Sequence, residues 1–402
     1  MAFDFTSILD RSGKDSIATD GLGIAPGAPE PPASGFDAIP MWIADMSFPV
    51  APCIIEAIQA RLEHPCFGYF SPSEAYTQAI ISWQRRQHGL LDLAPEHIGY
   101  ENGVLGGVVS TVLAAAAPGD TVLIHSPTYI GFTRSLENAG FHIELSPLVK
   151  DEQGVFRMDF DDMEARLANT HAHVAVLCSP YNPIGRVWER EELERAMEIY
   201  ARHDCIVVSD EIWSDVVRPG VVHIPTQQVS EDARRRTVAL YAPNKSFNIA
   251  GLVSGYHIIY DEALRDRVVA RSTKSHYNAM NMLSMHALIG AYSDEGAAWV
   301  AELNRVLAAH ADRARAFFGE HAPTIDISAP QGTYMLWLDA GEWCKERGCS
   351  LDELLAAGWR VGVGWQDGRP FHGPSHIRMN LALPEARLEE ALHRLADHVF
   401  DV

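Results

Sequence analysis

The segment CIVVSDEIW at residues 205–213 joins a short apolar run to two carboxylates and an indole. The run at 205–209 is rich in β-branched residues and almost continuously apolar, which is typical of a strand buried on both faces of a parallel sheet. Asp210 follows at once, and open α/β sheets bind ligands just beyond the carboxyl ends of their strands. We therefore expect a covered parallel sheet with Asp210 at its ligand-binding edge.

Comparable runs recur along the chain and alternate with helical patterns. The expected strands are 121–125, 141–145, 174–178, 205–209, 237–241 and 254–260. The expected helices are 52–63, 73–88, 104–116, 131–139, 159–168, 189–202 and 262–270. This alternation predicts an α/β fold with a mostly parallel sheet that helices cover on both faces.

The pattern changes near residue 284. Residues 284–319 predict long Ala-rich helices, and the remainder mixes strands at 334–338 and 376–381 with two further helices, as in a smaller α+β domain. Residues 21–40 are rich in Gly, Pro and Ala and predict a loop or arm. We expect three parts, which are an N-terminal arm of the small domain (1–46), a large α/β domain (47–284) and a small C-terminal α+β domain (285–402).

Composition excludes several classes of protein. The 402 residues hold 32 Lys and Arg against 53 Asp and Glu, a formal net charge of −21. Nucleic acids and anionic membrane surfaces both attract clustered basic residues, so neither is an expected partner. The chain shows no signal-like start and no apolar run of membrane-spanning length, so we expect a cytoplasmic protein. Its six cysteines lack zinc-site spacing, and no metal is expected.

Five residues with reactive or ligand-binding groups follow predicted strands or precede a helix. Their positions in chain order are Gly103, Tyr129, Asn182, Asp210 and Lys245. Each alone has an ordinary explanation, such as a turn, a core ring or a surface lysine. Because strand ends of one parallel sheet meet at one edge, we expect all five to converge there.

Pyridoxal phosphate requires this combination of groups. A lysine amine forms a Schiff base with the cofactor aldehyde, and a carboxylate keeps the pyridine nitrogen protonated. An aromatic ring stacks on the pyridine, and an amide donates to the ring oxygen. A glycine turn that opens a helix offers backbone N–H groups to the phosphate. The sequence thus predicts a pyridoxal phosphate site.

Longer motifs carry a family likeness. They are MWIADMSFPVAPCIIEAIQARLEHPCFGYF (41–70), SPYNPIGRVW (179–188), VVSDEIWSD (207–215), HIP (223–225), APNKSFNIAGL (242–252), GTYMLWLD (332–339) and HIRMNLALP (376–384). In these motifs the chain resembles the fold type I pyridoxal phosphate enzymes of the aspartate aminotransferase superfamily, with a seven-stranded type of large-domain sheet. Within them it resembles the cystathionine β-lyase branch typified by MalY and PatB.

The resemblance implies a role for each site residue. Lys245 would bind the cofactor covalently and later transfer protons, while Asp210 would pair with the pyridine nitrogen. Asn182 would donate to the ring oxygen and Tyr129 would stack on the ring. The backbone of Gly103, Val104 and Leu105 would cradle the phosphate.

Two further roles concern the substrate and a second subunit. Arg378 would grip the substrate α-carboxylate, because a planar guanidinium matches a carboxylate bidentately. Tyr69 would reach the phosphate of a neighbouring subunit, which implies a homodimer with shared active sites.

The chain departs from the branch at three places. Trp213 stands where relatives usually carry Tyr or His directed at the ring oxygen, and indole donates but does not accept. Asn244 stands where the branch usually has a Ser that contacts the phosphate. The N-terminal pattern of the branch is altered in RSGKDSIATD (11–20).

The expected activity is carbon–sulfur β-elimination. An S-substituted L-cysteine such as cystathionine would give a thiol, pyruvate and ammonia. Three alternatives remain open at the level of sequence. They are an aminotransferase, a specialised decarboxylative or oxidative enzyme acting on cysteine conjugates, and a regulatory protein that binds the cofactor without turnover.

Overall fold

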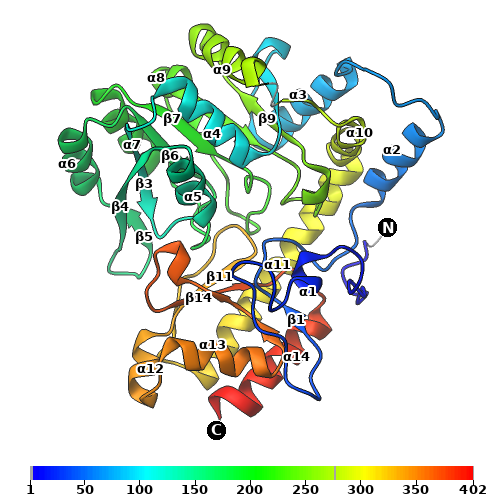
Figure 1. Cartoon of the computed structure of the whole chain (residues 1–402), viewed down its shortest axis with the longest axis vertical. Coiled ribbons are helices and arrows are strands. Elements are labelled where there is room, and N and C mark those ends of the chain that lie inside the picture. The colour runs from blue at the N-terminus through cyan, green and yellow to red at the C-terminus, as the bar shows by residue number, and fades with distance from the viewer. Residues whose placement is uncertain (1–2, 276–277, 402) are drawn as a thin grey trace.

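The computed structural model describes residues 3–275 and 278–401. It contains an eight-stranded sheet and a four-stranded antiparallel sheet, which lie one above the other in Figure 1, and a parallel pair of two-residue strands. The large sheet has eight strands. In spatial order they are β2 (Ile98–Glu101), β9 (Gly255–Ile258), β8 (Thr237–Tyr241), β7 (Ile206–Asp210), β6 (Val174–Cys178), β3 (Thr121–Ser126), β4 (His142–Lys150) and β5 (Phe156–Met158).

The large sheet confirms the predicted mostly parallel α/β fold. Strands β4, β3, β6, β7 and β8 run parallel, and every residue of β6 and β8 is buried. Three details differ from the sequence-based expectation. The strand near 254–260 pairs antiparallel with β8, and the unpredicted β2 and β5 bring the sheet to eight strands. Both are only three or four residues long, too short for a periodicity to stand out.

Helices pack on this sheet and enclose its core. They are α4 (Val104–Ala115), α5 (Ile130–Asn138), α6 (Phe160–Thr170), α7 (Arg190–Arg202), α8 (Glu231–Arg236) and α9 (Glu262–Ser275). Helix α4 is the most apolar of the six and packs against both β7 and β8. Its first turn is therefore held directly above the ends of the strands that carry Asp210 and lead to Lys245.

A second layer of helices flanks the edge strands. It comprises α2 (Pro52–Leu62), α3 (Glu74–His88) and α10 (Met282–Ala291), and α10 packs against the other two. The helical stretch expected from 284 to 319 divides at Ser293, whose side chain accepts a hydrogen bond from the Gly296 N–H and caps α11 (Asp294–His321). Helix α11 then runs from α10 to the small sheet (Figure 1).

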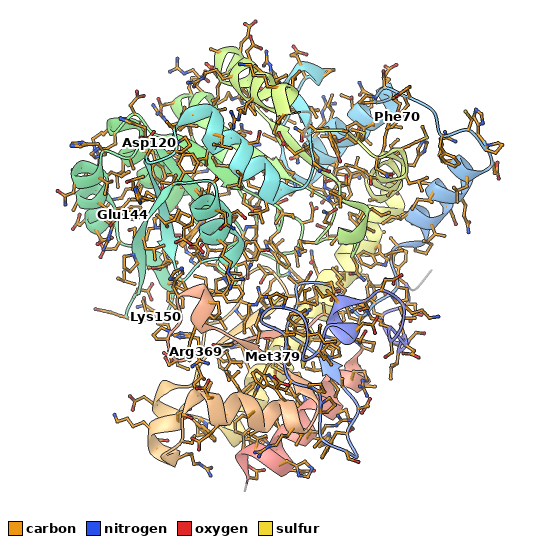
Figure 2. All side chains as sticks on the ribbon, viewed as in Figure 1. Phe70, Asp120, Glu144, Lys150, Arg369 and Met379 are labelled. Carbon is orange, nitrogen blue, oxygen red and sulfur yellow. The ribbon has the colours of Figure 1, made fainter. Side chains whose placement is uncertain are left out.

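The small sheet has the antiparallel order β10 (Asp326–Ile327), β11 (Met335–Asp339), β14 (His376–Asn380) and β13 (Gln366–Asp367). Helices α12 (Gly341–Arg347), α13 (Leu351–Arg360) and α14 (Glu385–Leu395) accompany it. Lys150 at the end of β4 forms an ion pair with Asp326 of β10, and this contact joins the two parts of the molecule (Lys150 is labelled in Figure 2).

The N-terminal arm lies against the C-terminal part of the chain. It contains α1 (Ile17–Asp20) and β1 (Ile39–Pro40), and β1 pairs in parallel with β12 (Val363–Gly364). Ile39 and Met41 are buried in the same cluster as residues of α11 and α14. The three-part division at residues 46 and 284 stays a prediction. No helix among the described residues is long and apolar enough to cross a membrane.

Arg394 of α14 fastens the arm to the small domain. Its buried guanidinium donates to the carbonyl oxygens of Asp37 at 2.7 Å and Val361 at 3.0 Å.

We expect Arg394→Ala to lower the free energy of unfolding by about 1–3 kcal/mol, because it leaves buried acceptors without donors. Urea denaturation followed by circular dichroism measures this. The control Arg313→Ala removes an exposed pair with Glu389 and should cost less than about 1 kcal/mol, and equal losses would contradict the assignment.

Candidate active site

A cavity of about 500 Å³ opens at the carboxyl ends of β3, β6, β7 and β8. Ten of the eleven residues expected at the site line it. They are Gly103, Val104, Leu105, Tyr129, Asn182, Asp210, Trp213, Asn244, Lys245 and Arg378. The edge of the large sheet brings together residues from Gly103 to Lys245, 142 positions apart in the chain, as the strand-end rule requires. Arg378 reaches the same cavity from β14 of the small sheet.

Lys245 lies in the turn after β8, and its side chain is partly buried. The amine donates a hydrogen bond to the Ala44 carbonyl oxygen at 2.6 Å and lies 5.6 Å from the centre of the Trp213 ring. Burial lowers the pKa of Lys245 to about 8, and the positive charge of Arg378 acts in the same direction. A substantial fraction of this amine is therefore neutral and nucleophilic near pH 8.

Asp210 ends β7 and is 5% exposed. One carboxylate oxygen accepts the Ile212 N–H at 3.0 Å, and no ion pair engages Asp210 within the described parts of the chain. Burial raises the pKa of Asp210 to about 7, although the nearby Lys245 charge opposes this. A buried carboxylate without a cation is costly, so the site fits a ligand that presents a cationic N–H here.

Arg378 of β14 carries the second uncompensated charge and is 3% exposed. It donates to the Asn182 side-chain oxygen at 3.0 Å, the Trp42 carbonyl at 3.0 Å and the Gln366 side-chain oxygen at 2.5 Å. Its guanidinium lies 4.4 Å from the centre of the Phe371 ring. Burial lowers the pKa of Arg378 to about 10, and its Nε has no hydrogen-bond partner among the described residues.

Every protein partner of Arg378 is neutral, so a positive charge is held ready in the cavity for an anion. A carboxylate is the natural complement, because two oxygens match the planar fork of a guanidinium. The side-chain oxygen of Asn182 accepts the hydrogen bond from Arg378. The NH₂ group of Asn182 can then donate to a ligand in the cavity.

The start of α4 forms an anion cradle. Gly103 is the N-cap, with the left-handed φ of 84°, and a glycine has no side chain with which to cap the helix. Val104 and Leu105 in the first turn line the cavity, and among the described residues no acceptor engages their N–H groups at this positive end of the helix dipole. Nearby, the Asn244 side-chain oxygen is buried and has no partner among the described residues.

Two aromatic residues wall the cavity. Tyr129, after β3, packs edge-on against Phe132, and burial raises its pKa. Trp213 is buried and meets the Tyr334 ring edge-on at 4.6 Å between ring centres. The Tyr334 hydroxyl donates to the same Ala44 carbonyl that receives Lys245, at 3.0 Å. Trp213 is thus fixed next to the amine.

Tyr69 is the one expected site residue outside the cavity. It lies fully exposed in the loop between α2 and α3, where Figure 2 labels the adjacent Phe70 at the upper right of the view. Its expected contact with a neighbouring subunit stays a prediction.

Sequence reasoning missed several residues that hold Arg378 and Lys245. Gln366 lies on a two-residue strand and Phe371 in a single 3₁₀ turn, neither of which leaves a pattern in the sequence. Trp42 and Ala44 contribute only backbone carbonyls, which any residue type could supply. In the sequence, the motif at residues 41–70 was the one signal that covered Trp42 and Ala44.

With this geometry in place, comparison with known proteins becomes informative. The model of the family "Aminotransferase class I and II" matches residues 38–395. The chain belongs to this aminotransferase class I and II family. It is 33% identical to cystathionine β-lyase PatB of Bacillus subtilis, over 98% of each protein, and 32% identical to protein MalY of Escherichia coli, over 99% of each. It also superimposes on cystalysin of Treponema denticola with a TM-score of 0.90 and 27% identity, each chain fully covered, and that crystal structure contains pyridoxal 5′-phosphate.

The raised pKa of Asp210 can be tested in this protein without any ligand bound. Its pKa is raised from 3.8 to about 7, so the folded protein binds more protons than the unfolded chain between those values. Its contribution to stability therefore falls as pH rises through this window. At pH 8 we expect Asp210→Asn to raise the free energy of unfolding of the apoprotein by about 1–3 kcal/mol.

The measurement is urea denaturation of the apoprotein at pH 5 and pH 8. The exposed Asp266→Asn on α9 serves as a control and should change stability little at either pH. An Asp210→Asn apoprotein that is less stable than the wild type at pH 8 would show that Asp210 is not an unsatisfied charge.

Proposed function

We propose that this protein is a pyridoxal phosphate-dependent carbon–sulfur β-lyase that cleaves S-substituted L-cysteines such as cystathionine to a thiol, pyruvate and ammonia. The observation that carries the proposal is the placement of a reactive amine, Lys245, in one cavity with the uncompensated charges of Asp210 and Arg378. The name of PatB, a cystathionine β-lyase that aligns over almost the whole chain, supports the lyase assignment.

The residues present fit the cofactor. Asp210 would keep the pyridine nitrogen protonated, which relieves the unpaired buried carboxylate. Asn182 would donate to the ring oxygen and Tyr129 would lie on the ring face. The uncapped first turn of α4, from Gly103 onward, would hold the phosphate, and Asn244 lies nearby. When bound, the cofactor supplies an electron sink that stabilises negative charge at the substrate Cα.

The protein residues then orient the substrate and move its proton. Arg378 would bind the α-carboxylate through its free Nε side and fix the Cα–H bond relative to Lys245. Lys245, with a pKa of about 8, is suited to take the Cα proton near neutral pH and to return a proton later. Trp213 packs beside the amine, and the Tyr334 hydroxyl shares the Ala44 acceptor with it. Departure of the thiolate from Cβ, which takes up a proton, would complete the elimination. The 2-aminoacrylate that is released would then react with water to give pyruvate and ammonia.

The test is a panel of S-substituted cysteines with pyruvate, thiol and carbon dioxide measured together. We expect stoichiometric pyruvate and thiol from the wild-type holoenzyme. Lys245→Ala should lose both the visible absorbance of the covalently attached cofactor and more than about 10²-fold of the activity. Lys345→Ala, an exposed lysine on α12, should retain both.

Other outcomes select the alternatives. Conversion of an amino donor and a keto acid without thiol release would establish an aminotransferase. Carbon dioxide without pyruvate would establish a decarboxylative enzyme, and bound cofactor with no turnover would establish a binding protein. Visible absorbance that survives Lys245→Ala would overturn the role of Lys245.

We also propose that the protein acts as a homodimer in which Tyr69 completes the partner's phosphate site. Tyr69 and Phe67 are exposed aromatic residues on one loop, which a second copy of the chain would cover. The expected result is complementation, because in a mixture of inactive Tyr69→Ala and Lys245→Ala subunits half of the dimers are mixed and each mixed dimer has one intact site. Re-associated mixtures should recover about one quarter of wild-type activity.

Light scattering should give the mass of two chains. A Tyr69→Phe variant, which keeps the ring, controls for effects on dimer formation alone. A mixture that stays inactive while mixed dimers form would contradict the shared site.

A further inference from the structure

The turn that leads into α4 is held in place from outside the cofactor cavity. It consists of Glu101, Asn102 and Gly103, and the Gly103 N–H donates to the Glu101 carbonyl oxygen at 2.8 Å. Asn102 and Gly103 line the cavity, whereas the fully buried Glu101 side chain does not. It packs against the second turn of α4, where a Cβ at Gly107 would lie 3.2 Å from the Glu101 Cγ. The turn therefore rests on a carboxylate that a ligand in the cavity does not touch.

Each carboxylate oxygen of Glu101 has its own hydrogen-bond donor. His257 of β9 is 2% exposed and contacts Oε1 through its Nδ1 at 2.7 Å. Asn278, between α9 and α10, donates its NH₂ group to Oε2 at 3.1 Å. A buried carboxylate is costly without such partners, so the two contacts both satisfy Glu101 and fix its orientation.

Asn278 connects this carboxylate to the backbone of the turn. Its side-chain oxygen accepts the Asn102 N–H at 3.0 Å, while its NH₂ group is bonded to Glu101. A primary amide can do both, because it carries an acceptor and two donors. We call this chain of contacts the cradle relay, and it consists of His257, Glu101, Asn278 and the Asn102 N–H.

The bridge by Asn278 separates the cradle relay from an ordinary pair between strands. A contact between Glu101 and His257 alone would hold β2 against β9, as cross-strand pairs commonly do. Asn278 extends that contact to the N–H of the residue immediately before Gly103, the N-cap of α4. The relay thus acts on the position at which α4 begins.

We propose that Glu101 and Asn278 are positioning residues that set the first turn of α4 for a phosphate monoester, and that this setting selects the phosphorylated cofactor over its unphosphorylated form. The inference rests on the proposed function, in which this turn holds the phosphate. Binding groups must be held to within about 0.5 Å of their productive geometry, and supporting hydrogen bonds do this. A loosened turn would lose affinity for the phosphate, while Asp210 and Lys245 would still bind the ring.

The test measures the dissociation constants of pyridoxal 5′-phosphate and of pyridoxal for the apoprotein by absorbance and fluorescence titration. Both aldehydes can react with Lys245, so the ratio of the pyridoxal constant to the pyridoxal phosphate constant isolates the phosphate contribution. Asn278→Ala removes both hydrogen bonds of the half-buried amide without changing any charge, and should lower the ratio about three- to tenfold. Asn169→Ala, on the exposed surface of α6, should leave it unchanged.

A second set of variants tests the hydrogen-bonded connection itself. Asn278→Asp places two carboxylates opposite each other and should lower the ratio about tenfold or more. Adding Glu101→Gln exchanges the acid and the amide and returns the charge to its original value. The amide at position 101 can then donate to the carboxylate at position 278, whose other oxygen accepts the Asn102 N–H. We expect the double variant to regain a ratio within about twofold of the wild type.

The outcomes separate this inference from the proposed function. A ratio that Asn278→Ala leaves unchanged overturns the cradle relay, and so does an equal weakening of both ligands, which would indicate a general effect on folding. A double variant no better than Asn278→Asp alone also overturns it. A wild-type apoprotein that binds the two forms equally would show that the α4 turn does not select phosphate. Binding of neither form by the wild type would overturn the proposed function itself.

Discussion

Much of this structure depends on keeping Arg378 buried and positively charged without a carboxylate beside it. Its guanidinium is held by an amide from the end of β6, a carbonyl from the N-terminal arm and a side chain from β13. Three segments far apart in the sequence must therefore meet around one side chain. Neutral hydrogen-bond acceptors fix its position without cancelling its charge, so the cavity presents an unbalanced positive charge.

The large sheet imposes the complementary constraint. Its parallel central strands all end at one edge, so chemistry can be distributed over Tyr129, Asn182, Asp210 and Lys245 while each residue stays on a rigid support. The small sheet and the arm close the same edge from the opposite side. The cavity thus lies between a rigid half that carries Asp210 and Lys245 and a more irregular half that carries Arg378.

The division between the two halves also explains how far the sequence could be interpreted. Long buried strands and helices such as β6 and α4 leave a clear periodicity, and the residues after them could be assigned to one edge from topology alone. The contacts from Trp42, Ala44, Gln366 and Phe371 come from short or irregular segments, where backbone groups and tertiary packing decide the geometry. The proposed contribution of Tyr69 would depend on a second chain, about which a single fold carries no information.

Asp210 and Arg378 are buried charges of opposite sign, and neither forms an ion pair among the described residues. This arrangement affects the stability of the fold as well as the reaction. A group that binds the folded chain but not the unfolded one raises stability by mass action, by about 2.7 kcal/mol when its concentration is a hundred times its dissociation constant. Here the groups that would bind the ligand are buried charges, and without a ligand they lower the free energy of unfolding. Loss of the ligand should therefore raise the fraction of unfolded chains, and with it the susceptibility of the protein to proteolysis.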